Sequence, residues 1–348
     1  MKLTCLSVLL VACQSAKVST DGGAADGGGA DDAGADGGGA EDGGTDGGGA
    51  GGDGGGSDGG SPDGGDLDGG GTDGGSSDGG GDGGTPVLAP DYREAGPYSV
   101  GSADGSTDLG DGCTLNWTRF SPSGAPELPT VIFGHGFMRS RAQHVDMATH
   151  LASWGLSVVT VDFCHSNVLD ADHAQNARDM VLLGEAVATG AVLYAGHSAG
   201  GLSAILAGAE DPGAAGVLGL DPVDVSNLGL DAAPDVEVPV LALVGELSSC
   251  NSNNNGVAVV TLVPDGEMLR VTDADHCDYE SNTDWLCTLT CTGGNDSFSD
   301  EEIGRTIRGF STAALLSLSG GAPEAAQWWT PGETWYVDML TSGAVRLP

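Results

Sequence analysis

The stretch AVLYAGHSAGG at residues 191–201 decides the expected fold. It begins with the apolar run Ala191–Ala195, which predicts a short buried strand. After Gly201 small residues continue at helical spacing to about Gly208. A strand that turns at once into a helix leaves little room for Cβ atoms, so glycines on both sides of the central residue suit such a turn. The sequence therefore predicts that Ser198 lies on a tight strand–turn–helix, with its hydroxyl exposed above a sheet.

Strand and helix patterns alternate on both sides of this stretch. Repeated strand–helix units predict an α/β fold in which a mostly parallel central sheet carries helices on both faces. Two earlier runs, at 98–102 and 114–120, are expected to be antiparallel edge strands. The further strands are expected at 129–133, 156–163, 215–220, 238–244 and 268–272, and the clearest helices at 141–154, 171–188 and 300–318.

The G-x-S-x-G motif at 196–200 resembles the nucleophile elbow of the α/β-hydrolase fold, and the resemblance covers most of residues 115–318. Three further segments are similar to chlorophyllase-like and dienelactone-hydrolase-like esterases, namely FGHGF at 133–137, GLDPVD at 219–224 and DHCD at 275–278. The resemblance implies a serine hydrolase that cleaves carboxylic esters through a Ser-His-Asp triad and an acyl-enzyme. Such chemistry needs no metal and no cofactor.

The resemblance also assigns roles to particular residues. Ser198 would be the nucleophile, and His276, the last histidine of the chain, would be the general base. The backbone N–H groups of Phe137 and Ala199 would form the oxyanion hole. His135 would be a structural residue of the loop that carries Phe137.

The acid of the triad must lie between the serine and the histidine in the chain. Asp221 is the first choice because the GLDPVD segment resembles the one that carries the acid in chlorophyllase-like hydrolases, although it ends the strand before the usual one. Glu246, which ends the next strand, and Asp224 remain alternatives. The residues alone do not decide among these three carboxylates.

Other functions are compatible with the same residues. An amidase or peptidase and an acyltransferase would use the same triad on another bond or acceptor. A catalytically inactive binding protein at the cell surface could retain the fold alone. The expected substrate is a small-molecule or polymeric ester, and we expect a monomer.

Charge and composition divide the chain. It has 348 residues, 50 Asp+Glu against 11 Lys+Arg, and a net charge of −39, which disfavours nucleic-acid binding because nucleic acids are polyanions. More than half of the 63 glycines lie at 21–84, where almost nothing apolar could be buried. We therefore expect a Gly/Asp-rich disordered linker at 13–90 and a catalytic domain at 91–348.

The N-terminus resembles an export signal. Lys2 and the apolar run Leu3–Ala12 are typical of a signal peptide and too short to span a bilayer. Residues 10–13, Leu-Val-Ala-Cys, resemble a bacterial lipobox, which would make Cys13 a lipidated first residue and anchor the protein to a membrane. The expected location is the outer membrane or cell surface, or otherwise the periplasm or the outside of the cell.

Cysteine usage agrees with export. Six cysteines remain in the expected domain, and an even number in an exported domain predicts three disulfides. No spacing typical of a zinc site is present. The pairs that we expect are Cys113–Cys164, Cys250–Cys277 and Cys287–Cys291, out of 15 possible connectivities.

Overall fold

The computed structural model describes residues 87–348 except 111, 282, 284, 286, 288–290, 292 and 293. The signal peptide expected at 1–12, the lipidation of Cys13 and nearly all of the linker expected at 13–90 lie outside the described residues. In the part of the chain that is described, no helix is long and apolar enough to cross a membrane.

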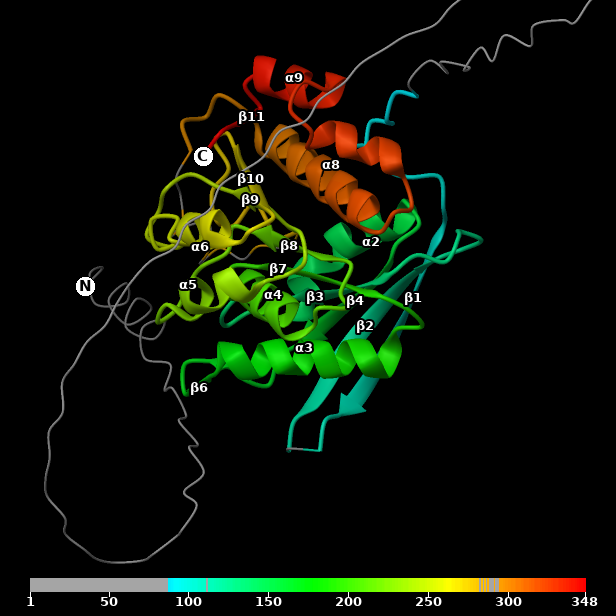
Figure 1. Cartoon of the computed structure of the whole chain (residues 1–348), viewed down its shortest axis with the longest axis vertical. Coiled ribbons are helices and arrows are strands. Elements are labelled where there is room, and N and C mark those ends of the chain that lie inside the picture. Colours follow the sequence, from blue (N-terminus) through cyan, green and yellow to red (C-terminus); the bar gives the residue numbers. More distant parts are fainter. Residues whose placement is uncertain are drawn as a thin grey trace, which may run out of the picture. The chain divides into compact units, whose positions relative to one another are not determined.

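A nine-stranded sheet forms the centre of the domain, in the order β1-β2-β4-β3-β7-β8-β9-β10-β11 (Figure 1). The pairs from β4 to β10 are parallel, and the pairs β1–β2, β2–β4 and β10–β11 are antiparallel. The strands are β1 (Val100–Asp108), β2 (Thr114–Pro122), β3 (Thr130–Gly134), β4 (Ser157–Asp162), β7 (Val192–His197), β8 (Gly216–Leu220), β9 (Val240–Val244), β10 (Gly266–Val271) and β11 (Val345–Arg346), with β5 (Ser166–Asn167) and β6 (Asp170–Ala171) in a separate hairpin.

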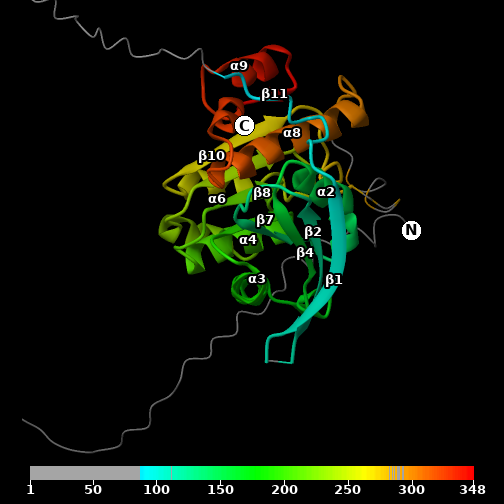
Figure 2. The same cartoon turned by 90° about the vertical axis from the view of Figure 1, so that its right-hand side faces the viewer.

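Helices cover both faces of this sheet because successive strand residues point in opposite directions. In β3, Val131 and Phe133 pack with α2 (Val145–Ser153) and α8 (Asp300–Leu318), whereas Ile132 packs with α3 (His173–Val187) and α4 (Ala199–Glu210). Figures 1 and 2 show these two helix pairs on opposite sides of the strands. The helices are η1 (Arg141–His144), α2 (Val145–Ser153), α3 (His173–Val187), α4 (Ala199–Glu210), α5 (Leu228–Ala232), η2 (Ala233–Asp235), α6 (Gly256–Leu262), α8 (Asp300–Leu318), η3 (Pro323–Trp328) and α9 (Thr334–Thr341).

The α/β class and the mostly parallel sheet are therefore confirmed. The expected edge strands are present as β1 and β2, although both are longer than the apolar runs that predicted them. The helix expected from 141 begins as the 3-10 turn η1 and becomes α-helical at Val145. Helix α8 has the expected bounds, and Ser299 and Glu302 form a capping box at its start.

Three disulfides join cysteines of the described part of the chain, but only one of the expected pairs is correct. Cys113 is bonded to Cys164, as predicted. The other pairs are Cys250–Cys291 and Cys277–Cys287, so the predictions Cys250–Cys277 and Cys287–Cys291 are wrong. The amide of Cys291 donates to the carbonyl of Cys287, as in a helical turn, where Cβ atoms four residues apart are about 5–6 Å from each other. A disulfide needs Cβ atoms about 3.5–4.5 Å apart, so neighbours on such a turn do not pair readily.

The domain begins before Asp91, the boundary expected from composition. Ala89 is 2% exposed, its amide donates to Oε1 of Gln327, and its carbonyl accepts from Nε1 of Trp335. Gln327 also donates through Nε2 to the carbonyl of Val87. Residues 87–90 therefore belong to the packed domain and not to the linker.

We expect a chain that starts at residue 91 to be less stable than one that starts at residue 85. The shorter chain loses the burial of Ala89 and three hydrogen bonds, worth together about 2–3 kcal/mol. Its Tm should therefore be about 5–10 °C lower in a thermal scan followed by circular dichroism. Equal Tm values for the two chains would contradict this account of the boundary.

Candidate active site

Ser198 lies between β7 and α4 on the tight turn that the sequence predicts. Its φ of 57° and ψ of −121° are strained values for a residue with a side chain. A Cβ added to Gly196 would lie 2.3 Å from the carbonyl oxygen of Gly200, and one added to Gly200 would lie 2.4 Å from that of Gly134. Glycine is therefore required on both sides of Ser198, because backbone packs directly against backbone there.

Three loops at the carboxyl ends of the strands bring a serine, a histidine and an aspartate together. Oγ of Ser198 lies 2.9 Å from Nε2 of His276, in the loop that follows β10. Nδ1 of the same imidazole lies 2.6 Å from Oδ2 of Asp221, which directly follows β8. The three side chains are buried or nearly so, at 9%, 7% and 1% exposed. They form a continuous hydrogen-bonded chain from a hydroxyl to a carboxylate.

The carboxylate of Asp221 is held in one orientation. The amide of Gly245 donates to its Oδ1 at 2.9 Å, and Nδ2 of Asn251 donates to its Oδ2 at 3.1 Å. Asn251 is fully buried and also donates to the carbonyl of Glu246. Sequence reasoning missed Asn251, since a polar NSNNN segment reads only as a loop.

The two alternative acids are engaged elsewhere. Glu246 accepts through Oε1 from the amide of Asp273, and its Oε2 lies 2.6 Å from the guanidinium of Arg346. Asp224 instead accepts from the amides of Gly229 and Leu230, at the start of α5. Neither carboxylate contacts an imidazole, so of the three candidates the structure brings only Asp221 to His276.

The loop after β3 lies against the serine. A Cβ added to Gly136 would be 3.2 Å from Cβ of Ser198, so the backbone of this loop lies close to the serine side chain. As the first residue of α4, Ala199 has no acceptor for its amide within the helix. Among the hydrogen bonds between described residues, the amide of Phe137 also has no acceptor. Both amides expected to form an oxyanion hole are thus unpaired; Ala199 directly follows Ser198, and Phe137 directly follows Gly136.

His135 is buried and occupies a structural position, as the sequence predicts. Its Nδ1 donates to the carbonyl of Gly136, and its Nε2 accepts from the amide of Phe163. Burial lowers its pKa, which favours the neutral ring that these two contacts require. Burial also lowers the pKa of His144 to about 3.

The sequence predicts no role for His197, which is the variable residue of the motif. In the structure, however, this histidine contacts residues of the loop that carries His276. The ring is 1% exposed and lies 4.6 Å from the ring of His276, centroid to centroid. Its Nε2 donates to the backbone carbonyl of His276 at 2.9 Å. The ring of Tyr279 is stacked with that of His197, at a centroid distance of 6.0 Å and an interplanar angle of 14°. These contacts could not be read from the chain because the partners are about 80 residues away.

The sulfur atoms near His276 do not form a metal centre. Sγ atoms of Cys277, Cys287 and Cys291 lie within 4.8 Å of one another, but all three belong to disulfides and offer no thiolate ligand. The disulfides instead tie the loop that carries His276 to its own continuation and to the loop that carries Asn251. Bonded cysteines of this kind are typical of an oxidising, exported environment.

Comparison of the chain with models of protein families and with curated proteins found no match.

The loop of His276 also contains a carboxyl group with a strongly raised pKa. Burial, and then the nearby carboxylates of Asp275 and Asp300, raise the pKa of Asp278 from 3.8 to about 7. The folded state thus favours the neutral form. The stability linked to this group is fully present below pH 4 and is lost as the pH rises from about 4 to about 7.

We expect Asp278→Asn to remove this pH dependence, because Asn stays neutral and can still accept from the amide of Asp275 through its oxygen. At pH 8 the variant should be more stable than the wild type by roughly 2–4 kcal/mol, with little difference at pH 4. Urea unfolding at both pH values measures the effect. Asp338→Asn, on the exposed side of α9, is the control and should change stability by less than about 0.5 kcal/mol. An unchanged pH slope in Asp278→Asn would refute the assignment.

Proposed function

We propose that the protein is a serine hydrolase of the α/β-hydrolase fold that cleaves carboxylic esters through an acyl-enzyme. The observation that carries this proposal is the chain of contacts from Ser198 to His276 at 2.9 Å and from His276 to Asp221 at 2.6 Å. A general base must lie within hydrogen-bond reach of the proton that it takes, and its orienting acid within reach of the other nitrogen. The residues named from the resemblance are the ones that meet these distances.

The proposed reaction begins at the serine hydroxyl. Oγ of Ser198 attacks the ester carbonyl carbon while Nε2 of His276 takes its proton. Asp221 accepts from Nδ1–H, which keeps the imidazole in the tautomer that can act as a base and stabilises the imidazolium. The imidazolium then gives its proton to the alkoxide that leaves, and an acyl group remains on Ser198. Water attacks the acyl carbon while the same imidazole takes its proton, and the imidazolium returns that proton to Oγ as the carboxylic acid leaves.

The unpaired amides of Phe137 and Ala199 support the step in which negative charge develops on the carbonyl oxygen. A preorganised donor of this kind is typically worth about 3 kcal/mol of barrier. Since α4 begins at Ala199, the positive end of its helix dipole also faces the oxyanion. The arrangement thus stabilises a tetrahedral intermediate at the carbon attacked by Ser198.

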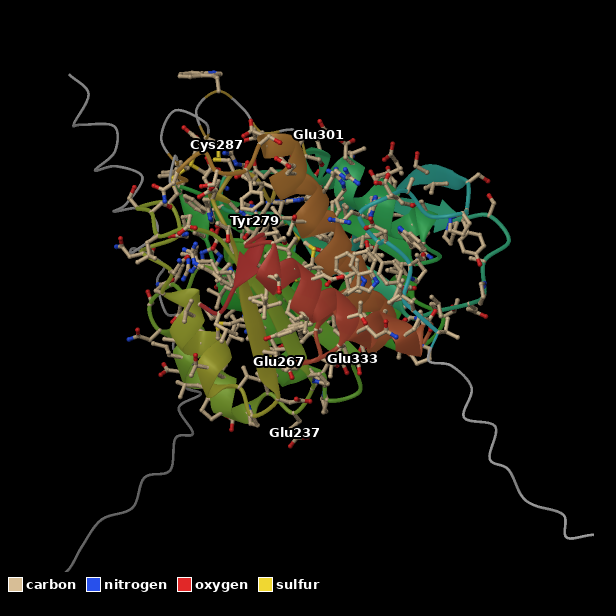
Figure 3. All side chains as sticks on the ribbon, turned by 90° about the horizontal axis from the view of Figure 1, so that it is seen from above. Glu237, Glu267, Tyr279, Cys287, Glu301 and Glu333 are labelled. Atoms are coloured by element: carbon tan, nitrogen blue, oxygen red, sulfur yellow. A yellow bond between two sulfur atoms is a disulfide. The ribbon has the colours of Figure 1, made fainter. Side chains whose placement is uncertain are left out.

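The surface of the domain favours neutral substrates. Exposed acidic side chains are spread over it, as the labelled Glu237, Glu267, Glu301 and Glu333 illustrate in Figure 3. A negative field repels polyanions and slows their association. We therefore propose an uncharged small-molecule or polymeric ester as substrate, met outside the cell by an exported protein that Cys13 would anchor to the membrane.

A fluorophosphonate probe tests the proposal directly. It should label the folded protein once, on the peptide that contains Ser198, and should not label protein unfolded in urea, because only the assembled site activates the hydroxyl. Matched ester and amide substrates then separate an esterase from an amidase or peptidase, and product analysis with added alcohol detects acyl transfer. A folded protein that neither reacts with the probe nor hydrolyses any ester would refute the proposal and leave a binding protein on the same scaffold.

A further inference from the structure

Glu280 is a buried carboxylate next to the candidate site. Its side chain is 0% exposed, although a carboxylate is costly to bury unless it is paired. Nε of Arg139 lies 2.9 Å from its Oε1, and the arginine side chain is 17% exposed. An ion pair this buried contributes little net stability compared with apolar packing, so its position calls for another explanation.

The pair joins two of the loops that form the site. Arg139 lies two residues after Phe137, and its amide donates to the carbonyl of Gly136 at 3.1 Å, closing the turn that presents the amide of Phe137. Glu280 lies four residues after His276, and its own amide donates to the carbonyl of Cys277 at 3.0 Å. The ion pair thus connects the oxyanion loop to the loop of the candidate base.

The same carboxylate lies beside the third loop. Nδ1 of His197 lies 3.7 Å from Oε1 of Glu280, and this histidine directly precedes Ser198. Through Nε2 it also holds the backbone carbonyl of His276 at 2.9 Å. Burial of the ring, with His276, His144 and Arg139 nearby, lowers the pKa of His197 well below 6.5, so the ring is neutral and acts as a fixed donor.

We propose that Glu280 is a positioning residue of this site, whose carboxylate, paired with Arg139 beside His197, fixes the oxyanion loop and the loop of His276 relative to Ser198. The inference rests on the proposed hydrolase function. The positioning role explains why the ion pair is buried at this place, which its small net contribution to stability does not explain. A displacement of the reacting groups by about 1 Å can cost about 100-fold in rate, so small movements of either loop are sufficient for a large effect.

Glu280→Gln tests the proposal with hydrolysis of a p-nitrophenyl ester. The variant keeps the size and one oxygen acceptor but loses the charge that holds Arg139. We expect kcat to fall about 10–100-fold while KM changes less than about threefold, because the substrate is still bound but the reacting groups are misaligned. Arg139→Gln should show a similar loss. The double variant should be about as slow as either single one, since both remove the same contact.

The ion pair between Arg305 and Glu94 is the matched control, because it is exposed and joins α8 to the segment before β1. Glu94→Gln should leave kcat unchanged within about twofold. Fluorophosphonate titration of active sites corrects every rate for the fraction of folded protein. If Glu280→Gln does not fold, Glu280→Asp retains the charge with a side chain one methylene shorter and should still lose about 10-fold in kcat.

The outcomes separate the two proposals. A wild-type protein that hydrolyses esters while Glu280→Gln or Glu280→Asp matches its kcat overturns the inference and leaves the proposed function intact. A loss that disappears after correction for folded protein also overturns it, because the ion pair would then serve stability alone. A wild-type protein without activity or labelling refutes the proposed function, and the inference with it.

Discussion

Ser198→Ala is expected to lower kcat for ester hydrolysis by about 10⁶-fold, the scale found when the nucleophile of a triad is removed. The variant lacks the oxygen that lies 2.9 Å from Nε2 of His276, so no acyl-enzyme can form. What remains is substrate binding and the two oxyanion amides, which still favour attack by water to a small extent. Ala also avoids a loss of fold, because the turn needs small residues and the Oγ of Ser198 is not part of the core.

The same prediction extends to the base. His276→Ala should cost about as much as Ser198→Ala, and the double variant should be no slower than either, since the two side chains act as one unit. Initial rates on a p-nitrophenyl ester, corrected by the folded fraction from circular dichroism, measure all three. Ser102→Ala, on the exposed edge strand β1, is the control and should keep wild-type kcat. If Ser198→Ala retains more than about a thousandth of the activity, another residue is the nucleophile.

The parts of the site that could be predicted from the chain are those fixed by local structure. Ser198 follows a clear apolar strand and precedes a helix of small residues, so its turn is determined within about ten residues. The carboxyl ends of parallel strands meet at one edge of the sheet, which is why Asp221 after β8 and His276 after β10 could be expected near it. The α/β class follows from the same alternation.

The parts that could not be predicted depend on loop paths between distant residues. Cys277, Cys287 and Cys291 have sulfur atoms within 4.8 Å of one another, so the correct pairs depend on backbone directions that no spacing encodes. Asn251 contacts Asp221, which is 30 residues away in the sequence, and Glu280 contacts Arg139, which is 141 residues away. Both Asn251 and Glu280 lie in polar segments whose composition predicts exposure to solvent. Ala89 follows a Gly-rich region, so composition predicts a linker there and gives no sign of the hydrogen bonds that Ala89 forms with η3 and α9.

Asp221→Asn is expected to lower kcat about 10⁴-fold, since the acid of a triad sets the tautomer of the base. The surroundings determine how the new amide must lie. The amide of Gly245 donates to Oδ1, so the oxygen of Asn has to occupy that position and its NH₂ group takes the place of Oδ2. That NH₂ group then faces Nδ1 of His276 and Nδ2 of Asn251, two positions that both require an acceptor.

In the Asp221→Asn variant, the imidazole of His276 can form a hydrogen bond with this NH₂ group only if the ring changes its tautomer. Nδ1 must accept from the new NH₂ group, so the proton moves to Nε2, and Nε2 can no longer take the proton of Ser198. The loss should therefore fall on kcat, with KM nearly unchanged, in initial-rate measurements at pH 7. Glu246→Gln and Asp224→Asn remove the other two carboxylates considered for this role, and each should retain kcat within about threefold after correction for folded protein. A variant of Glu246 or Asp224 that is slower than Asp221→Asn would mean that the contact at 2.6 Å is not the one that orients the base.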